Sequence, residues 1–138
     1  MSGNMDAQQI ASPRGIIVMF AEALPEHCPP AEATEREEFI GYRLIRAKTP
    51  CLDDFSSHAA RDPKKYGTSC RYFAVSLFSE RASLARLLEM PVHKNKTIAK
   101  VRLTPQSGRV QQTGQDPCHH DWWRYKDFDV VSACEVEE

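Results

Sequence analysis

The alternation of hydrophobic and polar positions predicts a small α+β domain. Residues 39–45 carry apolar side chains on both faces of a strand, which is typical of a central strand. Residues 97–103 alternate cleanly, with Ala99, Val101 and Leu103 on one face and charged side chains on the other. Further strands are expected over 70–78, 109–113 and 128–135. The pattern predicts a small mixed or antiparallel sheet of about five strands.

One main helix is expected after the second strand. Ser79 is a favourable N-cap, and Glu80 places a negative charge in the first turn. Pro91 cannot continue a helix, so the helix ends near Glu89. Its apolar face consists of Leu84, Leu87 and Leu88.

The first part of the chain has a different character. Residues 1–30 are expected to be a flexible or partly helical segment, and 31–138 a single α+β domain. Small polar residues over 1–12 predict disorder. A short helix is predicted over 15–24, where apolar residues recur every fourth position: Ile16, Phe20 and Leu24. Prolines then form a linker.

A long polar connection joins the first two strands. It spans 49–69 and includes Ser56, Ser57 and His58. Connections of this length are uncommon in small domains and are often functional. We expect a short helix within it.

The charge of the chain is unevenly distributed. Net charge is −1 over 138 residues. Residues 1–42 hold two basic and seven acidic side chains, whereas 43–72 hold seven basic and three acidic ones. The basic middle segment would attract phosphate or an acidic partner, or it is a solvated loop. A nucleic-acid partner is not expected, because such domains are normally more basic overall.

The cysteines and the apolar runs indicate a cytoplasmic protein. The five cysteines are odd in number and contain no Cys-x-x-Cys pair, which predicts reduced thiols. No apolar run reaches membrane-spanning length, so no membrane association is expected. The start of the chain lacks the ordered parts of a secretory signal.

The segment 118–125 contains more potentially metal-binding and proton-transferring side chains than any other part of the sequence. It contains Cys118, His119, His120 and both tryptophans, and it is expected to be a loop. Imidazole and thiol groups bind metals, but this spacing matches no standard zinc pattern. No metal cofactor is therefore expected, and a metal-dependent hydrolase that uses His119 or His120 is a third alternative for the function.

A second set of residues would suit a nucleotide. Arg43 faces the same side as Phe39 and Ile45, so it must find a carboxylate, carbonyl groups or a ligand. Ser76 lies on a strand that leads into a helix. An arginine binds phosphate in bidentate fashion, and aromatic rings stack on a base. The rings available for stacking are Tyr42, Tyr72 and Trp122.

These elements resemble ADP-ribosyltransferase-like domains. Tyr42-Arg43 on an early strand is similar to the first motif of that family, and Phe73 to Ala82, with Ser76, is similar to its second. The resemblance spans 39 to about 135 and implies a small bacterial-type protein that binds NAD. In the third motif the family has a glutamate, whereas this chain has His120, Asp121 and Trp122. Glu135 lies too late in the sequence to take that place.

The resemblance implies roles for individual residues, and one further alternative stays open. Arg43, Ser76, His120 and Asp121 would be catalytic, in a transferase or in a relative that only binds. The ligand would also contact a second set of residues, which consists of Tyr42, His58, His119, Trp122 and Trp123. The alternative is a non-enzymatic module that binds an unidentified protein partner through exposed Trp122, Trp123 and Tyr125.

Overall fold

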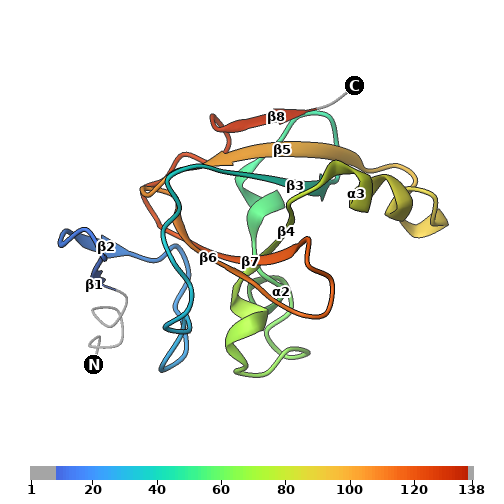
Figure 1. Cartoon of the computed structure of the whole chain (residues 1–138). Helices are drawn as coiled ribbons and strands as arrows, with labels where there is room; N and C mark the ends of the chain where they lie inside the picture. The colour runs from blue at the N-terminus through green and yellow to red at the C-terminus, as the bar shows by residue number, and fades with distance from the viewer. Residues whose placement is uncertain (1–8, 137–138) are drawn as a thin grey trace.

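A six-stranded antiparallel sheet forms the centre of the protein, in the order β6-β7-β4-β3-β5-β8 (Figure 1). The structure is a computed structural model that describes residues 9–136. The strands of the sheet are β3 (Phe39–Ile45), β4 (Val75–Phe78), β5 (Thr97–Leu103), β6 (Gly108–Gln112), β7 (His119–Arg124) and β8 (Cys134–Val136). A separate hairpin pairs β1 (Gln9–Ala11) with β2 (Ile17–Met19). The predicted α+β class is confirmed.

The helices are few and short. The α-helices are α2 (His58–Arg61) and α3 (Arg81–Leu87), and the 3-10 helices are η1 (Leu52–Phe55), η2 (Cys70–Phe73) and η3 (Pro91–His93). α3 is the predicted main helix and contacts β3 and β4. α2 is the short helix expected in the long connection, and the Ser57 hydroxyl caps it by accepting from the Ala60 N–H at 3.1 Å.

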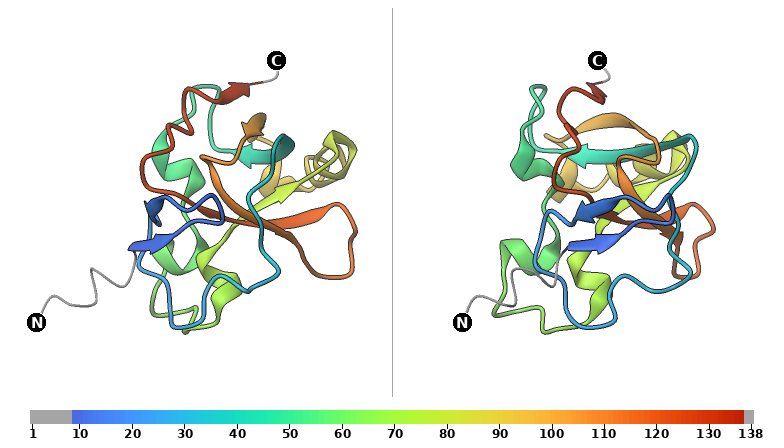
Figure 2. Two further views of the ribbon diagram at one scale, coloured as in Figure 1. Left: turned by 60° about the vertical axis from the view of Figure 1, so that its left-hand side comes forward. Right: turned by 90° about the vertical axis from the view of Figure 1, so that its left-hand side faces the viewer.

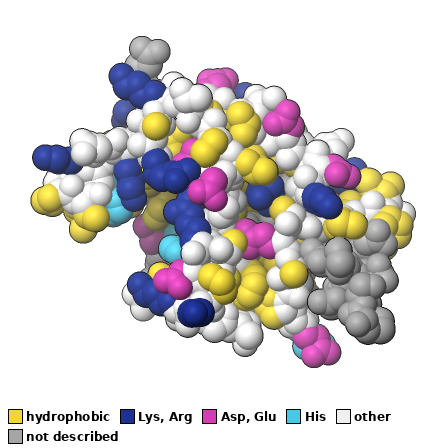
Figure 3. All heavy atoms as spheres, turned by 180° about the vertical axis from the view of Figure 1, so that it is seen from behind, with side chains coloured by type: hydrophobic (Ala, Val, Ile, Leu, Met, Phe, Trp, Pro, Cys, Tyr) yellow, Lys and Arg dark blue, Asp and Glu magenta, His cyan; other side chains and the backbone are white. Residues whose placement is uncertain are grey.

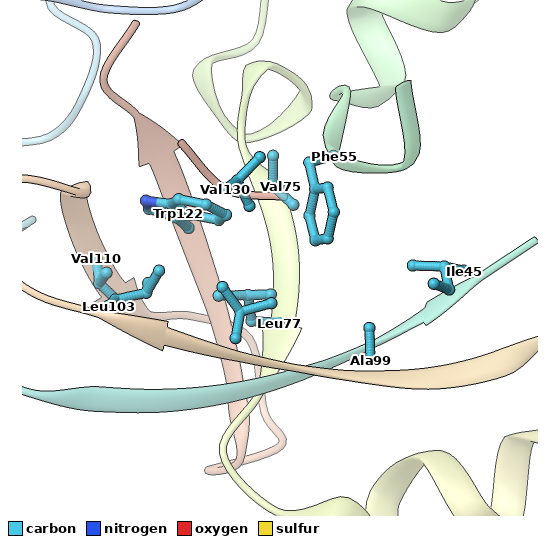
Figure 4. Close-up of a cluster of buried hydrophobic side chains, with 10 residues drawn as sticks. Ile45, Phe55, Val75, Leu77, Ala99, Leu103, Val110, Trp122 and Val130 are labelled. Carbon is cyan, nitrogen blue, oxygen red and sulfur yellow. The ribbon is translucent and has the colours of Figure 1, made fainter. Parts of the chain in front are cut away.

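One face of the sheet, called here the inner face, carries the main core. Alternate residues of each strand point to it, so distant parts of the chain contribute to one cluster (Figure 4). Trp122 is fully buried there, and its indole N–H donates to the Ser107 carbonyl at 3.1 Å. The main aliphatic members of the cluster are Ile45, Val75, Leu77, Val101, Leu103 and Val110.

The opposite face, called here the outer face, is partly covered by the N-terminal segment. Trp123 and Tyr125 are buried with Phe20 in a second cluster. Figure 2 shows the β1–β2 hairpin beside the end of β7, and backbone hydrogen bonds join Lys126 to Met19 at 2.7 Å and Ala21 to Arg124 at 2.9 Å. The segment is therefore an integral layer of the fold.

The predicted helix over 15–24 is wrong. Residues 17–19 form β2, and Phe20 makes a β-bridge with Tyr125. The apolar residues at every fourth position do not share one environment: Phe20 is buried in the second cluster and Leu24 packs against it, whereas Ile16 is exposed. The predicted disorder of 1–12 falls on residues 1–8, which lie outside the described residues, and on β1.

Three other expectations need correction. The segment around the two tryptophans is strand β7 and not a loop, because it pairs with β4 on one side and β6 on the other. Residues 70–73 form η2, so β4 is shorter than predicted. The last strand covers only 134–136, because 128–129 have no regular structure and 130–133 form turns.

Cys28 and Cys70 form a disulfide, so the expectation of reduced thiols is wrong for this pair. They lie 42 positions apart in sequence, and the fold brings their Cα atoms to 5.5 Å. A pair at that separation has no local sequence motif. The bond ties the N-terminal segment to η2. Cys51, Cys118 and Cys134 are free.

We predict that removing this disulfide lowers the free energy of unfolding. A cross-link between residues 42 positions apart lowers the conformational entropy of the unfolded chain, which raises the free energy of the unfolded state by about 4 kcal/mol. The double variant Cys28→Ser/Cys70→Ser should lose about 2–4 kcal/mol in urea unfolding, and a reductant should do the same to the unaltered protein. Cys118→Ser is the control, with no effect of comparable size. An unfolding midpoint that does not respond to the reductant would contradict the bond.

A second prediction concerns Gly108, the first residue of β6, which packs against the tryptophan strand β7. Gly108 has φ +138°, and a Cβ there would lie 2.2 Å from the Trp123 carbonyl oxygen. Gly108→Ala should therefore lower the free energy of unfolding by about 3 kcal/mol or more. Gly114 also has positive φ, at +75°, but nothing lies within 4 Å of its Cβ position. Gly114→Ala should cost only about 1 kcal/mol. Equal losses in urea unfolding would show that crowding at Gly108 is unimportant.

Candidate functional site

The candidate site lies where β3 and β4 separate. β3 pairs with β5 at all seven of its positions, yet it pairs with β4 only at Tyr42 and Phe78. Arg43 fills the gap that opens beyond this pair. Its Nε donates to the Asp54 carbonyl at 2.9 Å and its Nη1 to the Ser76 carbonyl at 2.8 Å. The arginine thus finds carbonyl groups, one of the partners expected from the sequence.

Arg43 carries a buried positive charge. Burial and, to a smaller extent, the positive charge of Arg61 lower the pKa of its guanidinium to about 10, and Asp54 acts against this shift. Within residues 9–136, no ion pair with a carboxylate involves Arg43. The Asp54 carboxylate instead accepts from Arg46 Nε at 3.1 Å and from the Cys51 N–H at 3.0 Å. An anion close to Arg43 would be stabilised electrostatically.

An open cavity of about 280 Å³ adjoins Arg43 and Ser76. Its wall contains both cationic and apolar side chains, and no Asp or Glu is among the described residues that line it. Figure 3 shows Lys and Arg side chains gathered with histidines on one side of the molecule. The other lining residues are Leu44, His58, Arg61, Phe78, Leu84, Leu87, His93 and Lys96.

The titration of His58 reports the electrostatics of this cavity. Its pKa is lowered from 6.5, first by burial and then by the positive charges of Arg43, Arg61 and Lys65. Asp121 acts in the opposite direction. Cations therefore dominate around the His58 ring, and its neutral form is favoured while the cavity holds no anion.

His119 contacts the cavity through Ser76. Its Nε2 lies 3.2 Å from the Ser76 hydroxyl, and its Nδ1 lies 3.0 Å from the Thr113 hydroxyl. The imidazole also packs edge-on against Phe78, with ring centroids 5.3 Å apart. Because β4 and β7 are adjacent and antiparallel, Ser76 lies directly opposite Asp121. These side chains share the outer face.

Asp121 is buried, with 5% of its surface exposed. Burial raises the pKa of its carboxyl group, and His119, a Thr113 hydrogen bond, Arg71 and His120 act against the rise. The ionised carboxylate is therefore less stable in the folded protein than in the unfolded chain.

The other predicted site residues lie elsewhere. His120 points to the inner face, where its ring lies 4.7 Å from that of Phe39 and its Nδ1 lies 3.0 Å from the Cys118 carbonyl. Trp122 is in the inner core. Tyr42 pairs with Phe78, but unlike Phe78 it does not line the cavity. Trp123 is in the outer cluster, where its indole N–H donates to the Cys70 carbonyl at 3.3 Å. Because successive side chains of β7 point to opposite faces of the sheet, the histidines and tryptophans of segment 118–125 are divided between the two faces.

Two expectations about segment 118–125 are wrong. Trp122, Trp123 and Tyr125 are 0%, 2% and 3% exposed, so they are not surface anchors for a partner. His119 and His120 point to opposite faces of β7, so the two histidines of the metal-dependent alternative do not converge on one site. In the described part of the chain, no group of three or more His, Cys, Asp or Glu side chains is placed to hold a metal.

The sequence analysis missed several cavity residues. Arg61 lies in the basic middle segment, which was a usable signal. Lys96 and His93 follow α3 in a stretch without a motif, and Leu84 and Leu87 were assigned only to the apolar face of the helix. Thr113 lies at the end of β6, and only the pairing of β6 with β7 brings it to His119.

We predict that Asp121→Asn stabilises the protein at neutral pH. The pKa of Asp121 is raised in the folded protein above its unfolded value of 3.8. The protonated carboxyl group therefore contributes fully to the free energy of unfolding below pH 3.8, and this contribution is lost as the pH rises through the folded pKa. The amide removes this loss, so the urea midpoint should rise at pH 7 and the gain should vanish below about pH 3.8.

Asp129→Asn is the matched control. Hydrogen bonds from Ser132 lower the pKa of the Asp129 carboxyl group, so this variant should not be stabilised at pH 7. A fall in the midpoint for Asp121→Asn would show that the carboxylate is satisfied despite burial.

Comparisons with known proteins leave the chain without an assigned family. No family model, no curated protein and no solved structure matches it. Among the described residues, none of the helices has the length and apolar character needed to cross a membrane. A functional conclusion therefore rests on the cavity beside Arg43 and on the side chains of β4 and β7.

Proposed function

We propose that this protein binds a nucleotide of the NAD class in the cavity beside Arg43. The observation that carries the proposal is the buried Arg43 guanidinium, which has no carboxylate partner among residues 9–136 and opens onto a cavity with Arg61 and Lys96 in its wall. Phosphate groups would complete the hydrogen bonding and offset the charge.

The apolar wall suits the rest of a nucleotide. Phe78, Leu84 and Leu87 form a surface against which a planar ring can pack. A volume of about 280 Å³ is at the lower end for ligand cavities, so it would hold one half of a dinucleotide and leave the other half on the surface.

The resemblance to ADP-ribosyltransferase-like domains agrees with this proposal. Its first two motifs meet in the structure, since Arg43 donates to the carbonyl of Ser76 at 2.8 Å. On the neighbouring strand, His119 and Asp121 share the outer face with Ser76, whereas His120 does not. We therefore assign the third position to His119 or Asp121 and propose ADP-ribosyl transfer as the reaction class.

Calorimetric titration with NAD tests binding. We expect saturable heat, and Lys96→Glu should weaken binding at least about tenfold, because a charged hydrogen bond contributes about 1.5 kcal/mol. Lys94→Glu is the matched control, because Lys94 lies two residues away and outside the cavity lining. Arg43→Ala should abolish binding, with circular dichroism to establish that it folds. No heat with the unaltered protein would overturn the proposal.

NMR titration of His58 gives an independent readout. Without ligand, the pKa of His58 should lie below 6.5 because burial and three cations oppose its protonation. A bound phosphate would neutralise those cations, so the pKa should rise when NAD is added. The exposed His27 ring is the internal control. An unchanged His58 titration at saturating NAD would place the ligand elsewhere.

A further inference from the structure

Ser76 and His119 form a hydrogen-bonded pair at the edge of the cavity. The Ser76 hydroxyl and His119 Nε2 are 3.2 Å apart, which is the separation that a nucleophile and its base require. Ser76 itself is one of the residues that line the cavity, so the pair lies beside the space in which a molecule would bind. Neither residue belongs to the hydrophobic clusters.

A third residue orients the imidazole. His119 Nδ1 lies 3.0 Å from the Thr113 hydroxyl, and the Thr113 backbone N–H donates to the His119 carbonyl at 3.1 Å. If Nδ1 carries the proton and donates to Thr113, Nε2 is free to accept from Ser76. The Thr113 side chain also hydrogen-bonds Asp121, which lowers the pKa of that carboxyl group against burial. Hydrogen bonds thus connect the buried Asp121 carboxyl group, through Thr113 and His119, to the Ser76 hydroxyl.

The surroundings favour negative charge at the reacting centre. The Arg43 guanidinium is bound to the carbonyl of Ser76 itself, at 2.8 Å. Arg61 and Lys96 are in the same cavity wall. Fixed cations close to a serine stabilise the oxyanion that forms when its hydroxyl attacks a carbonyl or phosphoryl centre.

We propose that Ser76 is a nucleophile activated by His119, with anionic carboxylic esters as the substrate class. Ser76 Oγ forms a bond to the ester carbonyl carbon while its proton passes to His119 Nε2. The bond from this carbon to the leaving oxygen breaks, and His119 returns the proton to that oxygen. Water then cleaves the acyl-serine by the same steps and restores the serine.

The charge of the cavity selects among esters. A substrate with a free carboxylate on its acyl group would pair with the cations of Arg61 or Lys96, whereas a neutral acyl group would gain nothing from them. We therefore expect p-nitrophenyl hemisuccinate to be hydrolysed about tenfold faster than p-nitrophenyl acetate at equal concentration. Lys96→Glu should remove this preference.

Labelling with a fluorophosphonate tests the nucleophile directly. Ser76 Oγ would displace fluoride from phosphorus and leave a stable adduct, which peptide mass spectrometry should locate at residue 76. Ser76→Ala should give no adduct. Ser79→Ala is the matched control and should label normally, because Ser79 lies on the same segment but outside the cavity lining. Labelling should be about 100-fold slower in His119→Gln.

Thr113 is a positioning residue, so its test needs a different readout. Thr113→Val removes the acceptor for Nδ1 and should shift the pH profile of labelling, whereas Thr113→Ser should restore it. An adduct at another serine, or none on the folded unaltered protein, overturns the nucleophile. It leaves the NAD proposal standing, because NAD binding is measured by heat and by the His58 titration. Labelling of Ser76 without NAD binding would support the esterase proposal and overturn the NAD proposal.

Discussion

The buried guanidinium of Arg43 is the interaction on which the functional part of this structure depends. β3 and β4 pair at a single position and then part, which leaves carbonyl groups without strand partners. Arg43, on β3, donates to one of them, the Ser76 carbonyl of β4, and also to the Asp54 carbonyl of η1, so it joins β3 to both elements. A buried polar group must be hydrogen-bonded to be tolerated, and this one achieves that without a carboxylate. The uncompensated charge makes the adjoining cavity attractive to anions.

The strict alternation of β7 distributes chemistry between two environments. His119 and Asp121 point to the outer face with Ser76, while His120 and Trp122 point to the inner core. A strand buried on both faces separates neighbouring residues more effectively than a loop does. Consequently His119 is available to Ser76, and its neighbour His120 is confined against Phe39. The proposed nucleophile and its base arise from the pairing of β4 with β7, and Ser76 is the residue that this pair shares with the cavity lining.

The N-terminal segment completes the outer face at the opposite end of β7. Phe20 buries itself against Tyr125, and the hydroxyl of Tyr125 donates to Glu35 at 2.7 Å. Glu35 also pairs with Arg14 at 2.8 Å. With the Cys28–Cys70 disulfide, these contacts hold residues 14–35 on the sheet. Trp123 is only 2% exposed in this covered region.

The sequence by itself determined the α+β class, the strands over 39–45 and 97–103, the main helix and the need of Arg43 for a partner. These follow from local alternation, from the proline that ends the helix and from the cost of an unpaired buried charge, whereas the predicted Ser79 cap is wrong because Glu80 is the N-cap of α3 and its side chain makes no capping hydrogen bond. The polar residues of His119–Arg124 concealed a strand, because pairing on both sides outweighs local propensity. Only the tertiary structure decided which carbonyls Arg43 binds, that Thr113 reaches His119, and that Cys28 meets Cys70. Each of these contacts joins segments whose separation in sequence carries no periodic signal, so only strand pairing and chain packing bring them together.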